Sequence, residues 1–253
     1  MKITIMGTGT ATPVLKRNAS GLVVAAARLL ILIDLGPGTL RRMCEAGVDF
    51  KTIDLILVTH FHPDHVSDLA PFLFASNYAY GPFRKEPFFL IGPTGLERLY
   101  AGLIEMYGHW IIPTGDRLSI KELNSQTADL FVSGDLMIRS VPAAHSHPAL
   151  SYRLEAEGSS LTVSGDTDMS ENLVELARGT DVLICECSMP DGSKISGHLT
   201  PSEAGISAQR AGAKKLVLTH FYPPCDEVDV VRQASTTFSG EIIRAEDLMV
   251  LDV

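Results

Sequence analysis

A seven-residue pattern occurs twice in the chain, 160 residues apart, and limits the folds open to it. Residues 57–63 read LVTHFHP and residues 217–223 read VLTHFYP. Each copy is an apolar run ending in Thr-His-Phe, as expected for a buried strand that delivers a histidine at its carboxyl edge. Either the match is a coincidence, or the chain has two structurally equivalent halves. In the second case the strand ends would meet at one site, where open α/β sheets bind ligands.

Apolar runs typical of strands alternate with helical patterns along the whole chain. Short runs of β-branched and leucine residues predict strands at residues 2–6, 22–26, 29–34, 54–59, 87–91, 130–132, 136–141, 151–155, 160–164, 181–187 and 215–219. Helical spacing predicts helices at residues 38–46, about 63–80, 94–107, 170–178, 201–211 and 228–238. No low-complexity linker divides the sequence. We therefore expect a single α/β domain over residues 1–253, with its sheets covered by helices.

The composition excludes several classes of protein. At 45% hydrophobic residues, the chain has too much apolar content for a disordered or collagen-like protein. Its longest apolar run, residues 22–33, contains Arg28 and is shorter than the roughly 20 residues that a bilayer requires. The opening residues lack a signal-peptide pattern, and four cysteines do not make a disulfide framework. We expect a cytoplasmic protein that does not interact with membranes.

The net charge of −9 makes a long nucleic acid a less expected partner. Proteins that grip many phosphates usually carry a basic stripe. No run of lysine and arginine here is longer than two residues.

Residues 60–65, with the sequence HFHPDH, place three imidazoles and a carboxylate directly after a predicted buried strand. Residues two apart in extended chain point the same way, so His60 and His62 can hold one ion. After the turn at Pro63, Asp64 and His65 can face a second ion. Imidazole nitrogen and carboxylate oxygen are suitable ligands for Zn²⁺ and related divalent ions.

This segment resembles the HxHxDH motif of the metallo-β-lactamase superfamily. His145, Asp166 and His220 follow in the order in which that superfamily supplies its other ligands. The resemblance implies a four-layer αβ/βα sandwich of two mixed sheets flanked by helices. Within the superfamily the chain is most similar to the ribonuclease Z branch, through residues 7–18 (GTG…PxxxRN) and residues 196–221 (SGHLT…KLVLTHF).

The resemblance also implies a ligand set for two divalent metal ions, with Zn²⁺ expected and Mn²⁺ or Fe²⁺ as alternatives. One ion would take His60, His62 and His145, and the other Asp64, His65 and His220, with Asp166 bridging them. The predicted catalytic residues are Asp64 and His198. A hydroxide held between the ions would attack phosphorus, and His198 would protonate the leaving oxygen. Glu186 either orients His198 or a ligand histidine, or is a simple buried, hydrogen-bonded glutamate.

One departure from the ribonuclease Z branch affects the expected substrate. Its tRNA-maturing members usually carry a tRNA-clamping arm between the third metal histidine and the bridging aspartate. Here His145 and Asp166 are only 21 residues apart, which leaves no room for that arm. We therefore expect a phosphodiesterase for a small anionic phosphodiester, with tRNA possible but disfavoured. The resemblance also suggests a homodimer.

Several alternatives remain open at this point. The enzyme could be a ribonuclease Z-type tRNA 3′-processing endonuclease, or a hydrolase of a carboxylic or sulfate ester or a lactone. A mononuclear iron dioxygenase would also keep the HxHxDH motif, and only the metal content of the protein distinguishes it from a binuclear hydrolase.

Individual residues also have alternative interpretations. His147 could replace His145 as ligand, and Asp168 could replace Asp166, although we expect Asp168 to cap a helix. Asp34 matches the superfamily residue that supports the metal loop. His109, beside Trp110, is expected to pack or to form a pocket wall.

Overall fold

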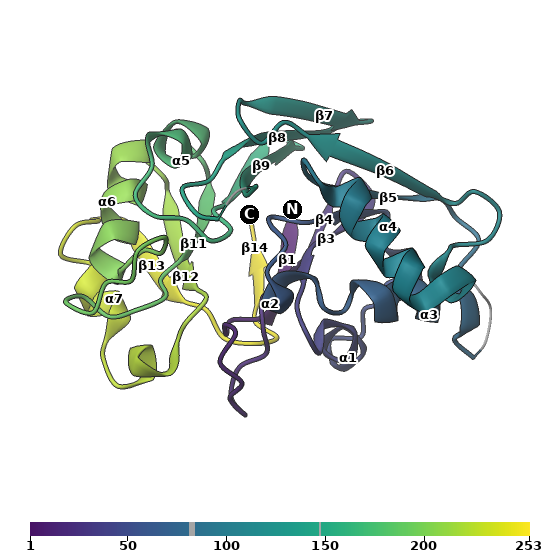
Figure 1. The fold of residues 1–253 in the computed structure, drawn as a ribbon. Coiled ribbons are helices and arrows are strands. Elements are labelled where there is room, and N and C mark those ends of the chain that lie inside the picture. The colour runs from purple at the N-terminus through teal and green to yellow at the C-terminus, as the bar shows by residue number, and fades with distance from the viewer. Residues whose placement is uncertain (81–83, 147) are drawn as a thin grey trace.

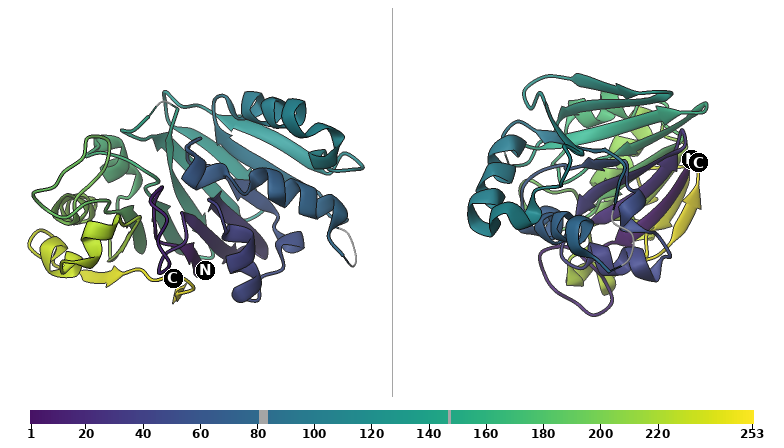
Figure 2. Two further views of the ribbon diagram at one scale, coloured as in Figure 1. Left: turned by 60° about the horizontal axis from the view of Figure 1, so that its bottom comes forward. Right: turned by 90° about the vertical axis from the view of Figure 1, so that its right-hand side faces the viewer.

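The computed structural model describes residues 1–80, 84–146 and 148–253. In this part of the chain two seven-stranded mixed sheets pack face to face between two layers of helices (Figures 1 and 2). This confirms the predicted four-layer αβ/βα sandwich.

The first sheet has the strand order β14-β1-β2-β3-β4-β5-β6. Neighbours pair antiparallel from β14 to β3 and parallel from β3 to β6. Its strands are β1 (Lys2–Gly7), β2 (Gly21–Ala26), β3 (Leu29–Leu35), β4 (Leu55–Leu57), β5 (Phe88–Pro93), β6 (Leu118–Leu123) and β14 (Val250–Asp252).

The second sheet has the order β7-β8-β9-β10-β11-β12-β13, read from the opposite edge. Neighbours pair antiparallel from β7 to β10 and parallel from β10 to β13. Its strands are β7 (Asp129–Ser133), β8 (Leu136–Pro142), β9 (Leu150–Ala156), β10 (Ser159–Val163), β11 (Val182–Glu186), β12 (Lys215–Thr219) and β13 (Glu241–Arg244).

The two sheets therefore have the same succession of three antiparallel and three parallel pairings, which supports the prediction of two equivalent halves. In this correspondence β4 matches β11, and β5 matches β12. The two Thr-His-Phe segments follow β4 and β12, so they do not occupy equivalent positions. The two sequences are similar because each follows a buried parallel strand that ends at the same site. They do not mark equivalent strands of the two halves.

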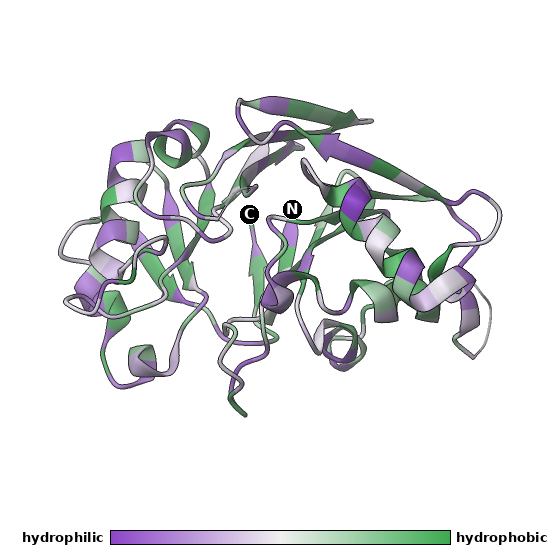
Figure 3. Cartoon of the chain, viewed as in Figure 1, coloured by the Kyte–Doolittle hydropathy of each residue, from purple (hydrophilic) through white to green (hydrophobic). Residues whose placement is uncertain are grey.

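Alternation along the strands divides the core into three apolar layers. Ile3, Ile5 and Tyr152 belong to the layer between the sheets. The opposite face of the first sheet, with Val23 and Leu32, packs against α-helices. On the second sheet, Cys185 belongs to the outer layer. Figure 3 shows the hydrophobic strands between the two helical layers.

The helices form the two outer layers of the sandwich (Figure 1). On the side of the first sheet lie α1 (Thr39–Glu45), α2 (Pro63–Val66), α3 (Leu69–Tyr78) and α4 (Leu96–Tyr107). On the side of the second sheet lie α5 (Glu171–Leu176), α6 (Pro201–Ala211) and α7 (Val230–Ala234). Short 3₁₀ helices are η1 (Phe50–Thr52), η2 (Gly108–Ile111) and η3 (Pro223–Asp226).

Two predicted helices differ from the structure. The expected helix at 63–80 is interrupted between α2 and α3, because Asp68 bonds to other segments there. Its amide donates to the Leu35 carbonyl, and its side-chain carboxylate accepts the Leu40 amide. The expected helix at 228–238 is limited to α7. Strands β6, β13 and β14 were not predicted, because these are edge or near-edge strands with partly exposed side chains and no continuous apolar run.

The two ends of the described chain lie side by side, because β14 pairs with β1 at the edge of the first sheet (Figure 1). The Val253 amide donates to the Met1 carbonyl oxygen at 3.0 Å. Within the described residues, no helix combines the length and hydropathy needed to cross a bilayer.

Candidate metal centre

The loops that follow β4, β8, β10 and β12 converge on one cluster of imidazoles and carboxylates. All seven side chains predicted as ligands lie in it. They form two groups, and within each group the ligand atoms lie within 4.8 Å of one another. The first group is His60, His62, His145 and Asp166; the second is Asp64, His65 and His220. His147 lies outside the described residues, and Asp168 is in neither group.

Local chain geometry brings four of these residues together. His60 follows β4 in extended chain, and His62 is the N-cap of α2, with Pro63 in its first turn. Proline is favoured there because its missing N–H and fixed φ suit the start of a helix. The turn carries Asp64 and His65 back beside His60, with the His65 amide donating to the His62 carbonyl at 2.9 Å. His62 is exposed at the mouth of the cluster, whereas the other three side chains are buried.

Asp34 at the carboxyl end of β3 holds this loop. Its Oδ1 accepts the Thr59 amide at 2.8 Å, and its Oδ2 accepts the Thr59 hydroxyl at 2.8 Å and His65 Nδ1 at 2.7 Å. Because the carboxylate accepts from Nδ1, the Nε2 lone pair of His65 points into the cluster. Asp34 has φ +57°, a left-handed conformation that aspartate tolerates better than most residues.

Two more histidines are oriented in the same way. The Thr59 hydroxyl donates to Asp34 and can therefore accept from His60 Nδ1 at 3.0 Å. The Gly197 carbonyl accepts from His145 Nδ1 at 2.8 Å. Both contacts direct Nε2 into the cluster. His62 Nδ1 lies 3.2 Å from His145 Nε2, so two nitrogen atoms converge on one point.

Unpartnered atoms test whether these residues fit metal ions. His60 Nε2 and Asp166 Oδ1 are buried and have no hydrogen-bond partner among the described residues. His65 Nε2 and His220 Nε2 face each other at 3.3 Å. Burying such groups without a partner is costly, and a cation between them would remove the cost. The donor set of imidazoles and carboxylates fits divalent ions of the zinc type.

The protonation pattern supports ionised carboxylates in the cluster. Burial raises the pKa of Asp64, but His220, 3.6 Å away, and the other nearby histidines outweigh burial and lower the value to about 2. Burial lowers the pKa of His60 to about 2, so this imidazole is neutral and its lone pair is available. Burial opposes protonation of His65, yet the charges of Asp166 and Asp34 raise its pKa.

His198 lies beside the two predicted ligand groups and contacts Glu186; one of its ring nitrogens also lies within 4.8 Å of ligand atoms of Asp166 and His220. Its Nδ1 is 2.9 Å from Glu186 Oε1, and its ring centroid is 4.9 Å from that of His145. Burial lowers the pKa of His198, but the Glu186 hydrogen bond and charge outweigh burial and raise it. Of the two interpretations of Glu186, the structure therefore supports contact with His198.

A loop anchored by Asp168 carries His198. Asp168 Oδ2 accepts the Gly197 amide at 2.9 Å, and Oδ1 accepts Lys194 Nζ at 2.7 Å. The prediction that Asp168 caps a helix is wrong, because the N-cap of α5 is Ser170. Instead, Asp168 fixes the loop whose Gly197 carbonyl orients His145.

Two residues at the site were missed by the sequence analysis. Thr59 precedes His60, and the repeated Thr-His pair was a signal that could have identified it. Ser188 lies two residues after Glu186 and contacts both His198 and His220. Because side chains two apart in extended chain point to the same side, Ser188 could have been placed on the side of Glu186, which faces the site, and away from Cys185 and Cys187.

Two surface clefts lie near the loops of the cluster, and only the first is lined by a residue of the cluster. One, of about 410 Å³, includes Asp64, Thr10 and Arg17 in its lining. The other, of about 510 Å³, includes Phe61, Arg98 and Pro148. Arg17 contributes to the architecture of its cleft, because its guanidinium donates to Thr8 and Asp226 at 2.7 Å each.

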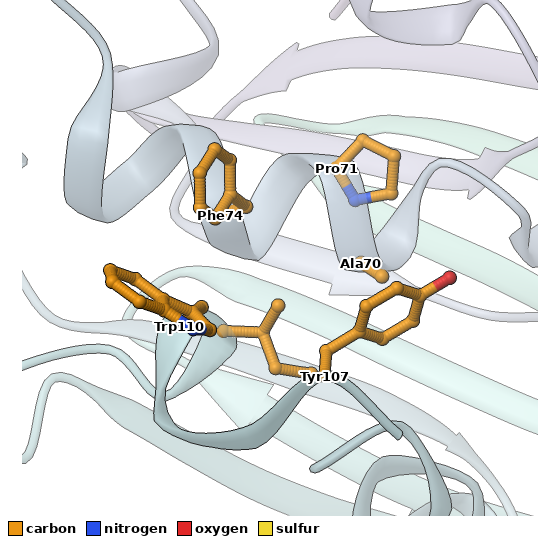
Figure 4. Close-up of a pocket in the computed structure, with 6 residues that line it drawn as sticks. Ala70, Pro71, Phe74, Tyr107 and Trp110 are labelled. Carbon is orange, nitrogen blue, oxygen red and sulfur yellow. The ribbon is translucent and has the colours of Figure 1, made fainter.

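A third cavity, of about 520 Å³, has a different character (Figure 4). Phe74 and Pro71 of α3 face Tyr107 and Trp110 across it. Trp110 forms part of this wall, and the His109 ring packs against it with centroids 4.4 Å apart and planes tilted by 32°, so His109 has the packing role predicted for it. Among the residues that the structure describes, no carboxylate or imidazole lines this cavity, so it does not provide the chemistry found at the cluster.

Several known proteins are similar to this chain in fold and in sequence. Ribonuclease Z of Mycobacterium bovis is 29% identical over 280 residues that cover 100% of this chain and 98% of the relative. The short form of human tRNase Z superposes with a TM-score of 0.81 at 26% identity, covering 100% and 99% of the two chains. The metallo-beta-lactamase fold protein YhfI of Bacillus subtilis has a TM-score of 0.83 at 22% identity, covering 99% of each chain.

A family model described as "Beta-lactamase superfamily domain" matches residues 30–221. This range includes strands of both sheets and all the residues predicted to bind metal. The order of the motifs, the sandwich and the sequence relatives agree with the match. The chain therefore belongs to the β-lactamase superfamily.

Proposed function

We propose that the chain is a binuclear metal-dependent hydrolase that cleaves phosphodiester bonds in RNA, as a ribonuclease Z-type 3′-processing endonuclease. The observation that carries the proposal is the meeting of two ligand groups beside the His198–Glu186 pair. Asp166 can serve both groups, because its carboxylate lies 3.7 Å from His60 Nε2 and 3.4 Å from His220 Nε2.

Each residue has a defined task in this proposal. When bound, the two ions, of which Zn²⁺ is the expected identity, polarise the phosphoryl oxygens and supply a hydroxide nucleophile at neutral pH. Asp64 and Asp166 supply negative charge to hold the ions, while the histidines supply lone pairs. His198, with Nδ1 bonded to Glu186, presents its other nitrogen to the leaving oxygen and donates a proton there.

The comparisons favour RNA over the small diester that the sequence analysis placed first. The curated relatives named ribonuclease Z align with the whole chain, and the short form of tRNase Z shares its fold throughout. These resemblances support RNA as the substrate class. We propose precursor tRNA as the RNA to test first, on the strength of the structural neighbour's name.

One observation favours a second candidate, a small phosphodiester. Strands β9 and β10 are joined by a two-residue turn, Glu157 and Gly158, both with positive φ as in a tight hairpin. In this part of the described chain, no tRNA-clamping arm is inserted between β9 and β10. A chain of net charge −9 without that clamp would bind a long RNA weakly, whereas a small diester needs no such clamp.

Cleavage assays with metal-loaded protein separate the two candidates. We expect accurate removal of a 3′ trailer from precursor tRNA, together with hydrolysis of bis(p-nitrophenyl) phosphate. His60→Ala should lose both activities, while His109→Ala, a matched histidine outside the cluster, should keep both. Hydrolysis of the small diester without cleavage of any RNA would support the second candidate. Activity only on lactones or carboxylic or sulfate esters would refute both.

Four other expectations remain predictions. Elemental analysis should find two divalent ions per chain, and limited proteolysis should leave a single domain over residues 1–253. Light scattering should give the mass of a homodimer. We also infer a cytoplasmic location, which fractionation of expressing cells tests.

A further inference from the structure

Ser188 lies just beyond β11, fully buried between two parts of the site. Its Oγ is 2.6 Å from Glu186 Oε2, 3.0 Å from His220 Nδ1 and 3.1 Å from His198 Nδ1. One hydroxyl therefore contacts a predicted metal ligand, the predicted acid and the carboxylate that supports it.

The direction of each hydrogen bond follows from the available protons. A hydroxyl has one proton to donate and two lone pairs to accept with. An ionised Glu186 can only accept, so the shortest contact is Ser188 donating to Glu186 Oε2. The Ser188 oxygen then accepts from His220 Nδ1, which leaves the His220 Nε2 lone pair facing Asp64 and Asp166.

His198 has a better acceptor than Ser188. Its Nδ1 lies 2.9 Å from Glu186 Oε1, closer than the Ser188 oxygen at 3.1 Å. The two carboxylate oxygens of Glu186 are thus divided, with Oε1 contacting His198 and Oε2 contacting Ser188. The Glu186 rotamer is also held by the Thr167 amide at 2.8 Å and the Leu199 amide at 3.1 Å.

We propose that Ser188 is a positioning residue that joins the metal centre to the acid, an inference that rests on the proposed hydrolase function. Its hydroxyl orients His220 with Nε2 toward Asp64 and Asp166, which would hold the ion together with it, and connects that histidine to the carboxylate that holds His198. Partners of metal-bound histidines commonly change metal affinity 10- to 100-fold when removed. The Ser188 hydroxyl occupies that position for His220.

The backbone of Ser188 does not depend on the hydroxyl. Its amide donates to the Leu199 carbonyl at 3.1 Å, and its carbonyl accepts the Tyr222 amide at 3.1 Å. Ser188→Ala should therefore keep the path of the chain while removing one oxygen atom. Ser76, a buried serine of α3 whose hydroxyl donates to the Phe72 carbonyl, provides the matched control.

Cobalt titration of metal-free protein tests the proposal without relying on activity, because Co²⁺ absorption reports the ligands around each ion. We expect Ser188→Ala to weaken the binding of one of two ions by about 10- to 100-fold, the usual effect of losing such a partner. Ser76→Ala should bind Co²⁺ like the wild type, and Ser188→Thr, which restores a hydroxyl, should recover most of the affinity.

A second readout tests the connection to His198. In zinc-loaded protein, Ser188→Ala should slow diesters with poor leaving groups more than it slows p-nitrophenyl esters. Wild-type affinity for both cobalt ions in Ser188→Ala would overturn the proposal, whether or not Ser188→Thr folds. If the wild type binds two cobalt ions but cleaves no phosphodiester, the proposed function fails while the effect of Ser188 on His220 can still be measured.

Discussion

Replacing Asp34 by alanine should be among the most damaging single changes in this protein. The buried carboxylate accepts three hydrogen bonds, two from Thr59 and one from His65. Alanine leaves the Thr59 amide and His65 Nδ1 without this partner. At about 1–3 kcal/mol for each buried orphan, the cost is about 2–6 kcal/mol.

The backbone adds a second cost at this position. Asp34 has φ +57°, and a left-handed conformation costs an alanine about 1–2 kcal/mol. The sum, about 3–8 kcal/mol, is a large part of the roughly 5–15 kcal/mol that stabilises a typical domain. Asp34→Asn should cost less, because asparagine tolerates this φ and its carbonyl can still accept the Thr59 amide.

Urea unfolding of metal-free protein in EDTA measures these differences without a contribution from bound ions. Asp116→Ala is the matched control, because Asp116 has φ +50° but is exposed, which isolates the backbone cost. Asp34→Ala should lower the free energy of unfolding by at least 2 kcal/mol more than Asp116→Ala does, given the orphaned donors. Equal losses in the two variants would refute the argument that Asp34 holds the metal loop.

Three further predictions concern the reaction and its scaffold. His198→Ala should keep the bound metal but slow substrates with poor leaving groups by about 10²–10⁴, and p-nitrophenyl esters far less; equal losses on both substrates would indicate a positioning role instead. Since Glu186 raises the pKa of His198, and the acid works only when protonated, Glu186→Gln should move the alkaline fall in kcat/KM to lower pH; an unmoved limb would exclude His198 as the acid. Gly36→Ala would place a Cβ 2.0 Å from the Asp64 carbonyl oxygen and should impair metal binding measured by calorimetry, whereas Gly102→Ala, with open space in α4, should not.

Features that depend on neighbours in sequence were predicted well. The residues from His60 to His65 lie together because extended chain followed by a helical turn brings them together whatever the rest of the fold does. The helix at 201–211 matches α6 in both bounds, and the Thr200 amide donates to the Glu203 carboxylate at 2.9 Å, as a capping box requires. His145 and Asp166 could be placed only through resemblance to a known family, since no local rule brings them to His60. For His220, the repeated Thr-His-Phe already suggested a meeting with His60.

Contacts between distant segments were decided by the tertiary structure. The repeated Thr-His-Phe suggested that β4 and β12 are equivalent strands. The order of strands in the two sheets instead makes β12 the counterpart of β5. Asp168 was expected at a helix end and instead holds the Gly197 loop, 29 residues away in sequence. Periodicity determines which face of a strand is buried, and the composition of a loop indicates its chemistry. The partner of a buried polar group, such as Ser188 for His220, depends on which strands become neighbours when the two sheets close over their shared core.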